Sequence, residues 1–340
     1  MKAAVVRAFG QPLVLEDRPD PQPGPGQIRV RVEACGLCHT DIHAALGDWP
    51  AQPLPPFVPG HEGVGIVEEC GAGVTHLTSG RRVAVPWLGW ACGRCEHCLG
   101  GWESLCPRQV NTGYGCDGAY AEKMLAHADF ALPVPDGLSA VEAAPLVCAG
   151  VTAYKALKVA GVRPAHLVAV CGIGGLGHLA VQYAKIAGAR VAAIDVVDDK
   201  LELASELGAD LVIDARTQDV AHVLRGQGGA HCALALAADD TAFEALHAGL
   251  RRGGTLVMVA LPAHGSLRVP VFDTVLKGIS VTGSIVGTRQ DLAEVLGLHA
   301  AGRTRVVFET RPLTSVNESL HDVRTGQVKA RVVFDLGAAR

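Results

Sequence analysis

The sequence predicts an α/β protein with two domains, and three observations carry this prediction. The chain has 340 residues, more than the roughly 150 that one domain usually contains. Its first third alternates apolar and polar residues in short runs between prolines and glycines, as short β-strands do. After about residue 145, short apolar runs alternate with stretches of helical spacing, which indicates a doubly wound parallel sheet with helices on both faces.

The first domain is expected to be a small, irregular β unit. Gln27–Glu33 alternates apolar and polar side chains, which is typical of a half-buried strand. Four prolines between residues 19 and 25 precede this strand and exclude a helix there. Arg82–Val85 is a further short strand that begins after Gly80, and a long loop rich in cysteine follows it.

The second domain is expected to alternate strands with helices. The predicted strands are Leu167–Cys171, Arg190–Asp195, Leu211–Asp214, Cys232–Leu236 and Thr255–Val259. The predicted helices are Leu176–Ala187, Asp198–Leu207 and, later in the chain, Asp291–Ala301. Ala330–Asp335 returns to a strand near the end of the sequence.

Composition excludes several classes of function. Hydrophobic residues make up 49% of the chain, enough to bury a large core, so wholesale disorder is excluded. The formal net charge is −4, so no strong basic field attracts nucleic acid or an anionic membrane. No apolar run looks long enough to cross a bilayer, and Met1–Arg7 does not resemble a signal peptide. We therefore expect a cytoplasmic protein without nucleic-acid or membrane partners.

A glycine-rich turn indicates a nucleotide site. Three glycines have the spacing G-x-G-x-x-G between a predicted strand and a predicted helix. Such glycines permit a tight turn and close approach of the backbone to a pyrophosphate, and the helix N-terminus offers free N–H groups. A plain strand–turn–helix without a ligand is the alternative. The predicted cofactor contacts in this turn are Gly172, Gly174, Gly175, Leu176 and Gly177.

Asp195 indicates which dinucleotide binds. It ends the next predicted strand, close to the spacing of about 20 residues that the Rossmann fingerprint has after its glycines. Its carboxylate can accept hydrogen bonds from an adenosine ribose and would repel a 2′-phosphate. The two residues after it are valines rather than an arginine that could bind such a phosphate. The sequence therefore predicts NAD rather than NADP.

Four of the 11 cysteines form a cluster in one short segment. They have the spacing C-x2-C-x2-C-x7-C and are Cys92, Cys95, Cys98 and Cys106. Four thiolates can complete a tetrahedral shell around zinc, and a closed shell leaves no position for a substrate. The sequence therefore predicts a structural zinc site, with an iron–sulfur cluster or four unliganded cysteines as alternatives.

A second set of candidate ligands is dispersed along the chain. Cys38, His61 and Cys148 would leave the fourth position of a zinc ion open, as catalysis requires, and Glu62 follows the histidine. Spacing cannot show that these groups converge. On residue type alone, both cysteines could equally be ordinary core residues.

Three segments resemble the zinc-dependent medium-chain alcohol dehydrogenases. Cys35–His43 reads CGLCHTDIH, Gly60–Val74 contains GHE followed by the family's spaced glycines, and Pro145–Gly150 reads PLVCAG. The four-cysteine loop and the glycine turn occur in the expected order, so the resemblance covers essentially the whole chain. The short, tetrameric alcohol dehydrogenases of bacteria and yeast are the most similar.

The resemblance assigns roles to single residues. It implies that Cys38, His61 and Cys148 bind the catalytic zinc, with Glu62 near the metal and Asp41 orienting His61. Thr40 and His43 would form a proton relay. Lys200 would contact the adenosine ribose, and Arg331 would contact the pyrophosphate. Trp49 and Trp87 would line the substrate pocket, although both could instead be core aromatics.

The resemblance also implies the domains and the activity. A GroES-like catalytic domain would comprise residues 1–146 and 287–340, and a Rossmann NAD-binding domain residues 147–286. We expect two zinc ions per chain, a homotetramer, and reversible hydride transfer from a short primary alcohol to NAD, giving an aldehyde. Secondary or aromatic alcohols, polyols or formaldehyde adducts are alternative substrates. A non-catalytic protein that kept the fold is the remaining alternative.

Overall fold

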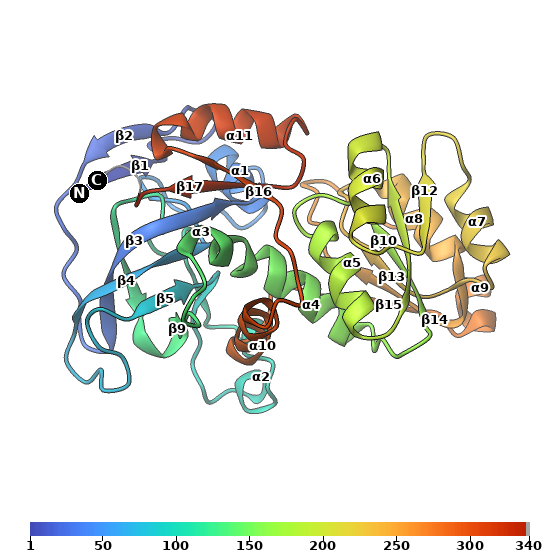
Figure 1. Ribbon diagram of the computed structural model, residues 1–340, viewed down its shortest axis with the longest axis horizontal. Helices are drawn as coiled ribbons and strands as arrows, with labels where there is room; N and C mark the ends of the chain where they lie inside the picture. Colours follow the sequence, from blue (N-terminus) through green and yellow to red (C-terminus); the bar gives the residue numbers. More distant parts are fainter. Residues whose placement is uncertain (338–340) are drawn as a thin grey trace. The chain divides into compact units, whose positions relative to one another are not determined.

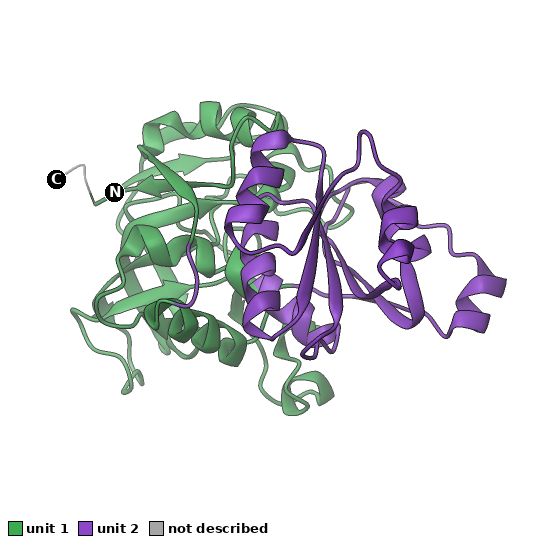
Figure 2. Ribbon diagram, turned by 45° about the vertical axis from the view of Figure 1, so that its right-hand side comes forward, with its two compact units in different colours: residues 1–151, 286–302, 306–340 green, residues 152–285, 303–305 purple. Residues whose placement is uncertain are grey.

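The computed structural model describes residues 1–337, which divide into two compact units (Figure 2). Unit 1 contains Met1–Val151, Val286–Gly302 and the chain from Val306 onward, and unit 2 contains Thr152–Ile285 and Arg303–Arg305. Residues 147–151 and 286 therefore belong to unit 1, whereas the sequence assigned them to the second domain. The reason is packing, because Val147, Val151 and Val286 line one small cavity together with Trp87 of unit 1.

Unit 2 is built on a six-stranded sheet in which all neighbouring strands are parallel (Figure 1). Its order is β12-β11-β10-β13-β14-β15, the order of a doubly wound Rossmann sheet. The strands are β10 (Leu167–Cys171), β11 (Arg190–Asp195), β12 (Leu211–Asp214), β13 (Ala230–Ala235), β14 (Leu250–Met258) and β15 (Ser280–Gly283). The helices between them are α5 (Gly177–Ile186), α6 (Asp198–Glu206), α7 (Val220–Gly226), α8 (Asp240–Ala248) and α9 (Val271–Lys277).

The bounds of β10, β11 and β12 agree with the prediction because each is a compact apolar run with few interruptions. By contrast, β14 begins five positions before the predicted Thr255, at Leu250. Exposed Arg251 and Arg252 interrupt the apolar pattern there, yet Leu250 pairs with Ala230 before the register shifts. Backbone pairing therefore extends this strand beyond its hydrophobic signal.

Unit 1 contains a sheet of seven strands with the order β16-β17-β3-β4-β5-β9, and β8 also pairs with β3 (Figure 1). The strands are β3 (Gln27–Leu37), β4 (Gly63–Cys70), β5 (Arg82–Val85), β8 (Lys123–His127), β9 (Leu132–Pro133), β16 (Phe308–Arg311) and β17 (Arg331–Asp335). The central strand β3 runs four residues past its predicted end at Glu33. Its residues 34–37 are all buried, so the alternation that identified the strand disappears there.

Smaller elements complete unit 1. Two-stranded sheets pair β1 (Lys2–Val5) with β2 (Val14–Asp17) and β6 (Leu88–Trp90) with β7 (Val110–Asn111). The helices are α1 (His39–Leu46), α2 (Glu96–Leu99), α3 (Ala140–Ala143), α10 (Arg289–Ala300) and α11 (Val316–Arg324), and α4 (Ala149–Val159) crosses the boundary between the units. Short 3-10 turns lie at Glu103–Leu105, Ala128–Phe130, Ala144–Leu146 and Leu313–Ser315.

One helical stretch corrects the expectation about membranes. Ala140–Val159 is long and apolar enough to span a bilayer by length and composition. However, 83% of the apolar window within it is buried inside the protein. The apolar character of this stretch is thus accounted for by its position in the core, and the sequence alone did not reveal its length.

Candidate functional site

The end of β3 and the start of α1 place the first candidate ligand. Cys38 follows the strand directly and is the N-cap residue of α1. Its backbone N–H donates to Oδ2 of Asp41 at 2.9 Å, as in a capping box. Local helix capping therefore fixes both the cysteine and the carboxylate that lies three residues later.

The structure brings the dispersed candidate ligands together. The side-chain ligand atoms of Cys38, His61, Glu62 and Cys148 all lie within 4.8 Å of one another, and all four residues are buried. A hydrogen bond between the two thiols lowers the pKa of Cys38 well below its ordinary value, against the effect of burial. The same contact raises the pKa of Cys148. The pair therefore favours one thiolate, the form in which cysteine binds a metal.

His61 is oriented by a buried carboxylate. Its Nδ1 lies 3.0 Å from Oδ1 of Asp41, and both side chains are 1% exposed. Nε2 is buried and has no hydrogen-bond partner among residues 1–337. Burial opposes protonation of His61, but the Asp41 carboxylate outweighs it and raises the pKa of the imidazole. When a metal ion displaces the proton from Nε2, an Nδ1–H held in this way leaves Nε2 as the ligand atom beside the thiols, which is the arrangement of a metal-ligating histidine.

Glu62 forms a buried ion pair with Arg331. Its Oε1 accepts a hydrogen bond from Nη2 of Arg331, and its Oε2 is buried without a partner in the described chain. Burial raises the pKa of Glu62 to about 7, although the positive charge of Arg331 opposes this. A Cβ at Gly36 would lie 1.7 Å from Oε2, so only glycine leaves room for this carboxylate. The pairing of Arg331 with Glu62 was not foreseen from the sequence, which indicated only a pyrophosphate contact.

A row of aromatic rings begins at one of the dispersed candidate ligands, His61. The ring of Trp87 meets His61 edge-on, with centroids 5.2 Å apart. Trp49 stacks on His43 at 4.7 Å. Tyr114 lies 5.3 Å from Trp87 and 6.2 Å from Trp49, so it joins the two indoles into one aromatic wall. The sequence gave no reason to single out Tyr114.

The two residues of the predicted relay lie on the same helix. Oγ1 of Thr40 is 3.7 Å from Sγ of Cys38. Nδ1 of His43 is 2.8 Å from Oδ1 of Asp48, a partner that the sequence did not suggest. His43 is partly exposed, whereas Thr40 lies beside the buried thiol. Thr40 therefore lies next to the buried thiol, and His43 lies about one helical turn further along α1.

The four-cysteine loop also converges. The sulfur atoms of Cys92, Cys95, Cys98 and Cys106 all lie within 4.8 Å of one another. The shortest separation is 3.5 Å, between Cys95 and Cys98, far beyond the roughly 2.05 Å of a disulfide bond. Cys106 is buried against Leu88 and Phe130, and the other three cysteines are partly buried.

An ion pair attaches this loop to helix α10. Glu103 receives hydrogen bonds from Nε and Nη2 of Arg289 at 2.8–3.1 Å, and from the backbone N–H of Arg289 at 2.8 Å. The guanidinium also lies 4.4 Å above the ring of Phe130. This hydrogen bonding raises the pKa of Arg289. The sequence analysis singled out neither Glu103 nor Arg289, because glutamate and arginine are common on protein surfaces.

The glycine turn of unit 2 is shaped for close approach. Gly172 has φ +94°, and a Cβ there would lie 2.8 Å from the backbone N of Ala237. A Cβ on Gly177 would lie 2.0 Å from the carbonyl oxygen of Gly172. A Cβ on Gly174 would meet nothing within 4 Å. Two glycines are therefore needed for the turn itself, while Gly174 presents bare backbone to open space just before α5.

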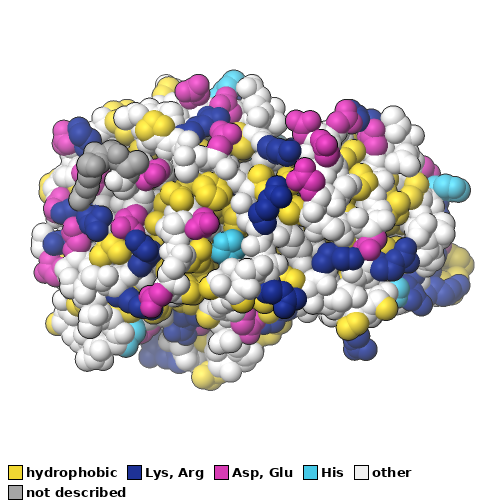
Figure 3. Space-filling model, in the orientation of Figure 1, with side chains coloured by type: hydrophobic (Ala, Val, Ile, Leu, Met, Phe, Trp, Pro, Cys, Tyr) yellow, Lys and Arg dark blue, Asp and Glu magenta, His cyan; other side chains and the backbone are white. Residues whose placement is uncertain are grey.

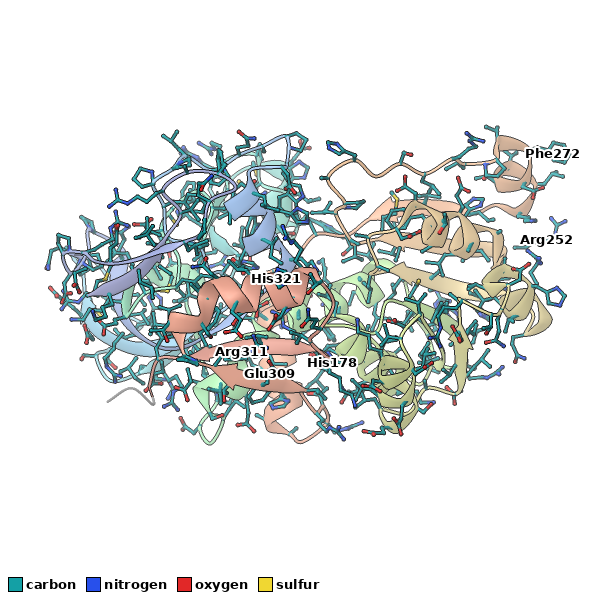
Figure 4. All side chains as sticks on the ribbon, turned by 90° about the horizontal axis from the view of Figure 1, so that it is seen from above. His178, Arg252, Phe272, Glu309, Arg311 and His321 are labelled. Atoms are coloured by element: carbon teal, nitrogen blue, oxygen red, sulfur yellow. The ribbon has the colours of Figure 1, made fainter. Side chains whose placement is uncertain are left out.

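Asp195 closes this turn from the end of β11. Its Oδ2 accepts the N–H of Ile173 at 2.6 Å, and its Oδ1 accepts those of Val196 and Val197 at 2.7 and 3.1 Å. Lys200 is partly buried in the first turn of α6. His178, labelled in Figure 4, is buried on α5, with Nδ1 3.0 Å from the carbonyl oxygen of Gly174.

Comparison with known proteins identifies the family. Residues 24–136 match the alcohol dehydrogenase GroES-like domain, and residues 175–301 match the zinc-binding dehydrogenase domain. The chain is 51% identical to an alcohol dehydrogenase of Geobacillus stearothermophilus, covering 98% of this chain and 99% of that protein. It is 54% identical to an alcohol dehydrogenase of Rhizobium meliloti, covering 99% of both. The chain belongs to the zinc-dependent medium-chain alcohol dehydrogenases.

Solved structures agree with this assignment. The alcohol dehydrogenase of Aeropyrum pernix has a TM-score of 0.92 and 35% identity, covering 98% of this chain and 100% of that one. An acetophenone reductase of Geotrichum candidum, solved in complex with NAD, has a TM-score of 0.88 and 30% identity, covering 99% and 97%. The predicted fold class, with a GroES-like and a Rossmann part, and the predicted alcohol dehydrogenase activity are thus confirmed at the level of the family.

The donor sets of this alcohol dehydrogenase fit zinc. The dispersed set offers two sulfurs and a buried Nε2 that has no other partner in the described chain. The loop set offers four sulfurs, which complete a tetrahedron without a further ligand. The first set therefore suits a metal with an open position, and the second suits a closed structural site.

Proposed function

We propose that this alcohol dehydrogenase oxidises short primary alcohols with NAD and, in reverse, reduces aldehydes. The observation that carries the proposal is the convergence of Cys38, His61 and Cys148, with Nε2 of His61 directed at the thiols and Asp41 on the other ring nitrogen. These three residues would hold one zinc ion per chain. The four cysteines of the loop would hold a second.

Zinc at the dispersed site would supply Lewis acidity, which favours loss of the alcohol's hydroxyl proton and polarises an aldehyde carbonyl. Asp41 keeps the proton of His61 on Nδ1 and so keeps Nε2 a ligand. The hydroxyl of Thr40, next to Cys38, would accept the substrate's proton while it gives up its own. His43, further along the relay, would exchange a proton with solvent at Nε2, because Asp48 holds its Nδ1.

The aromatic wall supports a preference for small substrates. Trp87 contacts the ligand His61 directly, and Tyr114 bridges Trp87 to Trp49. With Trp87 against His61 and two further rings continuing the wall, the space for the carbon chain of the alcohol would be narrow. A second substituent, as in a secondary alcohol, would have to displace one of these rings. The wall therefore favours ethanol-sized primary alcohols over secondary, aromatic or polyol substrates.

The glycine turn and Asp195 support NAD as the hydride acceptor. Each carboxylate oxygen of Asp195 has two lone pairs, and the backbone donors do not fill all of them. Asp195 would accept the ribose hydroxyls, with Lys200 as a second contact and Arg331 at the pyrophosphate. Asp195→Gly should therefore raise the KM for NAD about tenfold or more and lower that for NADP. Unchanged Michaelis constants for both cofactors would contradict the assignment.

Exposed apolar surfaces support a homotetramer. In unit 2, helix α9, which packs against β14, presents Val271, Phe272 and Val275, each more than 70% exposed. Phe272 projects outward from the helix in Figure 4. In unit 1, Leu99 and Trp102 of the four-cysteine loop are also exposed. Two separate apolar surfaces can serve the two distinct interfaces that a symmetric tetramer needs.

Charge and cysteine chemistry support the expected small-molecule substrate and the expected cytoplasmic location. The formal net charge of −4 supports a small-molecule substrate rather than a nucleic acid or an anionic membrane. On the face that Figure 3 shows, both acidic and basic side chains are present. Eleven cysteines that form no disulfide within the described chain agree with the reducing cytoplasm.

Steady-state kinetics on protein with counted zinc would test the proposed function. The panel comprises ethanol, longer primary alcohols, 2-propanol, benzyl alcohol, a polyol and the matching aldehydes, each with NAD and with NADP. We expect the highest kcat/KM for a short primary alcohol with NAD. A higher value for a secondary, aromatic or polyol substrate would assign the alternative specificity. Bound zinc without turnover of any alcohol would contradict an enzymatic role.

A further inference from the structure

A buried tyrosine reaches the network behind the proposed zinc site. Tyr120 is fully buried in unit 1, and its ring packs edge-on against Phe334 with centroids 5.1 Å apart. Its hydroxyl donates to Oδ2 of Asp41 at 3.0 Å. We propose that Tyr120 is a positioning residue, which locks the Asp41 carboxylate in the orientation that directs His61 at the metal. This inference rests on the proposed zinc-dependent function.

The four donors to Asp41 divide evenly between its two oxygens. Oδ1 accepts the backbone N–H of Gly60 at 3.1 Å and faces Nδ1 of His61 at 3.0 Å. Oδ2 accepts the backbone N–H of Cys38 at 2.9 Å and the hydroxyl of Tyr120. The terminal torsion of an aspartate has a broad minimum, so donors on both oxygens are needed to fix its plane. Tyr120 is the only side chain that donates to Oδ2 among the hydrogen bonds of residues 1–337.

The backbone holds this hydroxyl in place. The N–H of Tyr120 donates to the carbonyl of Pro59 at 3.0 Å, and its own carbonyl accepts the N–H of Ala4 in β1 at 2.8 Å. Gly60 has φ +97°, and a Cβ there would lie 2.4 Å from the ring of Tyr120. The segment that carries His61 therefore bends closely around this ring. Burial and the nearby Asp41 charge raise the pKa of Tyr120, so the hydroxyl remains a donor at neutral pH.

Tyr120→Phe isolates the hydroxyl because it keeps the ring and its packing. Tyr183→Phe is a matched control, since Tyr183 is equally buried but its hydroxyl has no hydrogen-bond partner among the described residues. Zinc-loaded protein is mixed with a chromogenic chelator, and the release of zinc and the loss of activity are followed together. We expect Tyr120→Phe to speed the release phase that tracks activity by about 3- to 10-fold, less than the 10- to 100-fold typical of losing a direct partner of a ligand.

A second measurement shows whether Tyr120 acts through Asp41. In an Asp41→Asn background, Tyr120→Phe should add far less to the release rate than it does in the wild type, because coupled residues are not additive. The slower, structural phase should match that of Tyr183→Phe, whereas the melting temperature of Tyr120→Phe should be the lower of the two, because only Tyr120→Phe removes a hydrogen bond to a buried carboxylate. Equal release rates in Tyr120→Phe and Tyr183→Phe, or full additivity with Asp41→Asn, would overturn the inference alone. Wild-type protein that binds no zinc at Cys38, His61 and Cys148 would overturn the proposed function as well.

Discussion

The two cysteine-containing sites of unit 1 are built in opposite ways. The loop site takes all its ligands from residues 92–106, whereas the dispersed site joins Cys38, His61 and Cys148 from three distant segments. The loop ligands are mostly only half-buried, while the dispersed ligands are all buried. A site within one loop can order that loop and the small apolar cluster of Leu88, Cys106 and Phe130 packed against it. A dispersed site is assembled by the fold and can therefore be held to a chosen geometry.

The contacts around the two sites differ as well. At the dispersed site, Asp41 holds the candidate ligand His61 by a hydrogen bond, and the ring of Trp87, backed by Tyr114, packs against His61. At the loop site, the strongest contact is the pair of Glu103 and Arg289, which anchors the loop rather than a ligand. We propose that the first environment is organised for chemistry and the second for stability. The predictions below test this division.

Cys148→Ser should cause the largest change in activity. Serine is a poor zinc ligand beside a thiolate, so the open metal site is lost. We expect kcat to fall by more than about 100-fold, beyond the usual cost of losing a partner of a ligand. Circular dichroism should show a native fold. Cys232→Ser is the control, because Cys232 is buried but lies outside both sites; if it loses as much activity, the effect is not specific to the metal.

Cys106→Ser should instead cause the largest loss of stability. Cys106 is fully buried among Leu88 and Phe130, and its loss would open the closed zinc shell. We expect the free energy of unfolding to fall by about 4 kcal/mol or more, as loss of a metal site can cause. The initial kcat of folded protein should stay close to wild type. Unchanged thermal stability and metal content would show that the loop holds no structural zinc.

Glu103→Gln should weaken the loop site by a smaller amount. It breaks a charged pair with Arg289 in which Glu103 is 11% exposed, so we expect a loss of about 1.5–3 kcal/mol in unfolding experiments. Glu206→Gln is the matched control, because its pair with Arg305 is 3.2 Å long and much more exposed. There we expect a loss below about 1 kcal/mol. Equal losses in both variants would mean that the loop is held by something other than this pair.

Trp87→Ala should change specificity with the smallest energetic effect. Removal of the indole beside His61 should raise the ratio of kcat/KM for benzyl alcohol to that for ethanol by about tenfold. NAD binding should be nearly unaffected. Trp90→Ala serves as the control at the other site, since Trp90 packs against the loop cluster of Leu88 and Cys106. If the ratio in Trp87→Ala equals that of the wild type, and the variant only loses stability as Trp90→Ala does, then Trp87 is a core residue and not part of the substrate pocket.

Sequence patterns predicted the ends of β10 and β11 better than those of β3 and β14 for a physical reason. Strands such as β10 and β11 are buried on both faces and appear as compact apolar runs. The end of β3 lost its alternation because Ala34–Leu37 are wholly buried, and β14 began under exposed arginines. In each case backbone pairing extends the strand beyond its side-chain pattern, past the end of the pattern in β3 and ahead of its start in β14.

The two cysteine-containing sites also differ in how far the sequence predicts them. The loop cysteines were predicted from spacing alone, because all four belong to one short segment. The dispersed ligands were predicted only through resemblance to a family, since spacing carries no information about convergence. Tyr114, Tyr120 and Asp48 were not predicted at all. Their roles depend on contacts with residues that are far away in the chain or of common types. The only feature that could have drawn attention to the two tyrosines is the low tyrosine content of the chain, 4 residues.

Zinc counting in three proteins tests the central claim most directly. Wild type, Cys148→Ser and Cys106→Ser are purified without chelator, and zinc per chain is measured together with kcat and the melting temperature. The account predicts two zinc ions in the wild type and one in each variant, with activity lost in Cys148→Ser and stability lost in Cys106→Ser. A single zinc in the wild type, or loss of activity and stability together in both variants, would contradict the division between a chemical and a structural site.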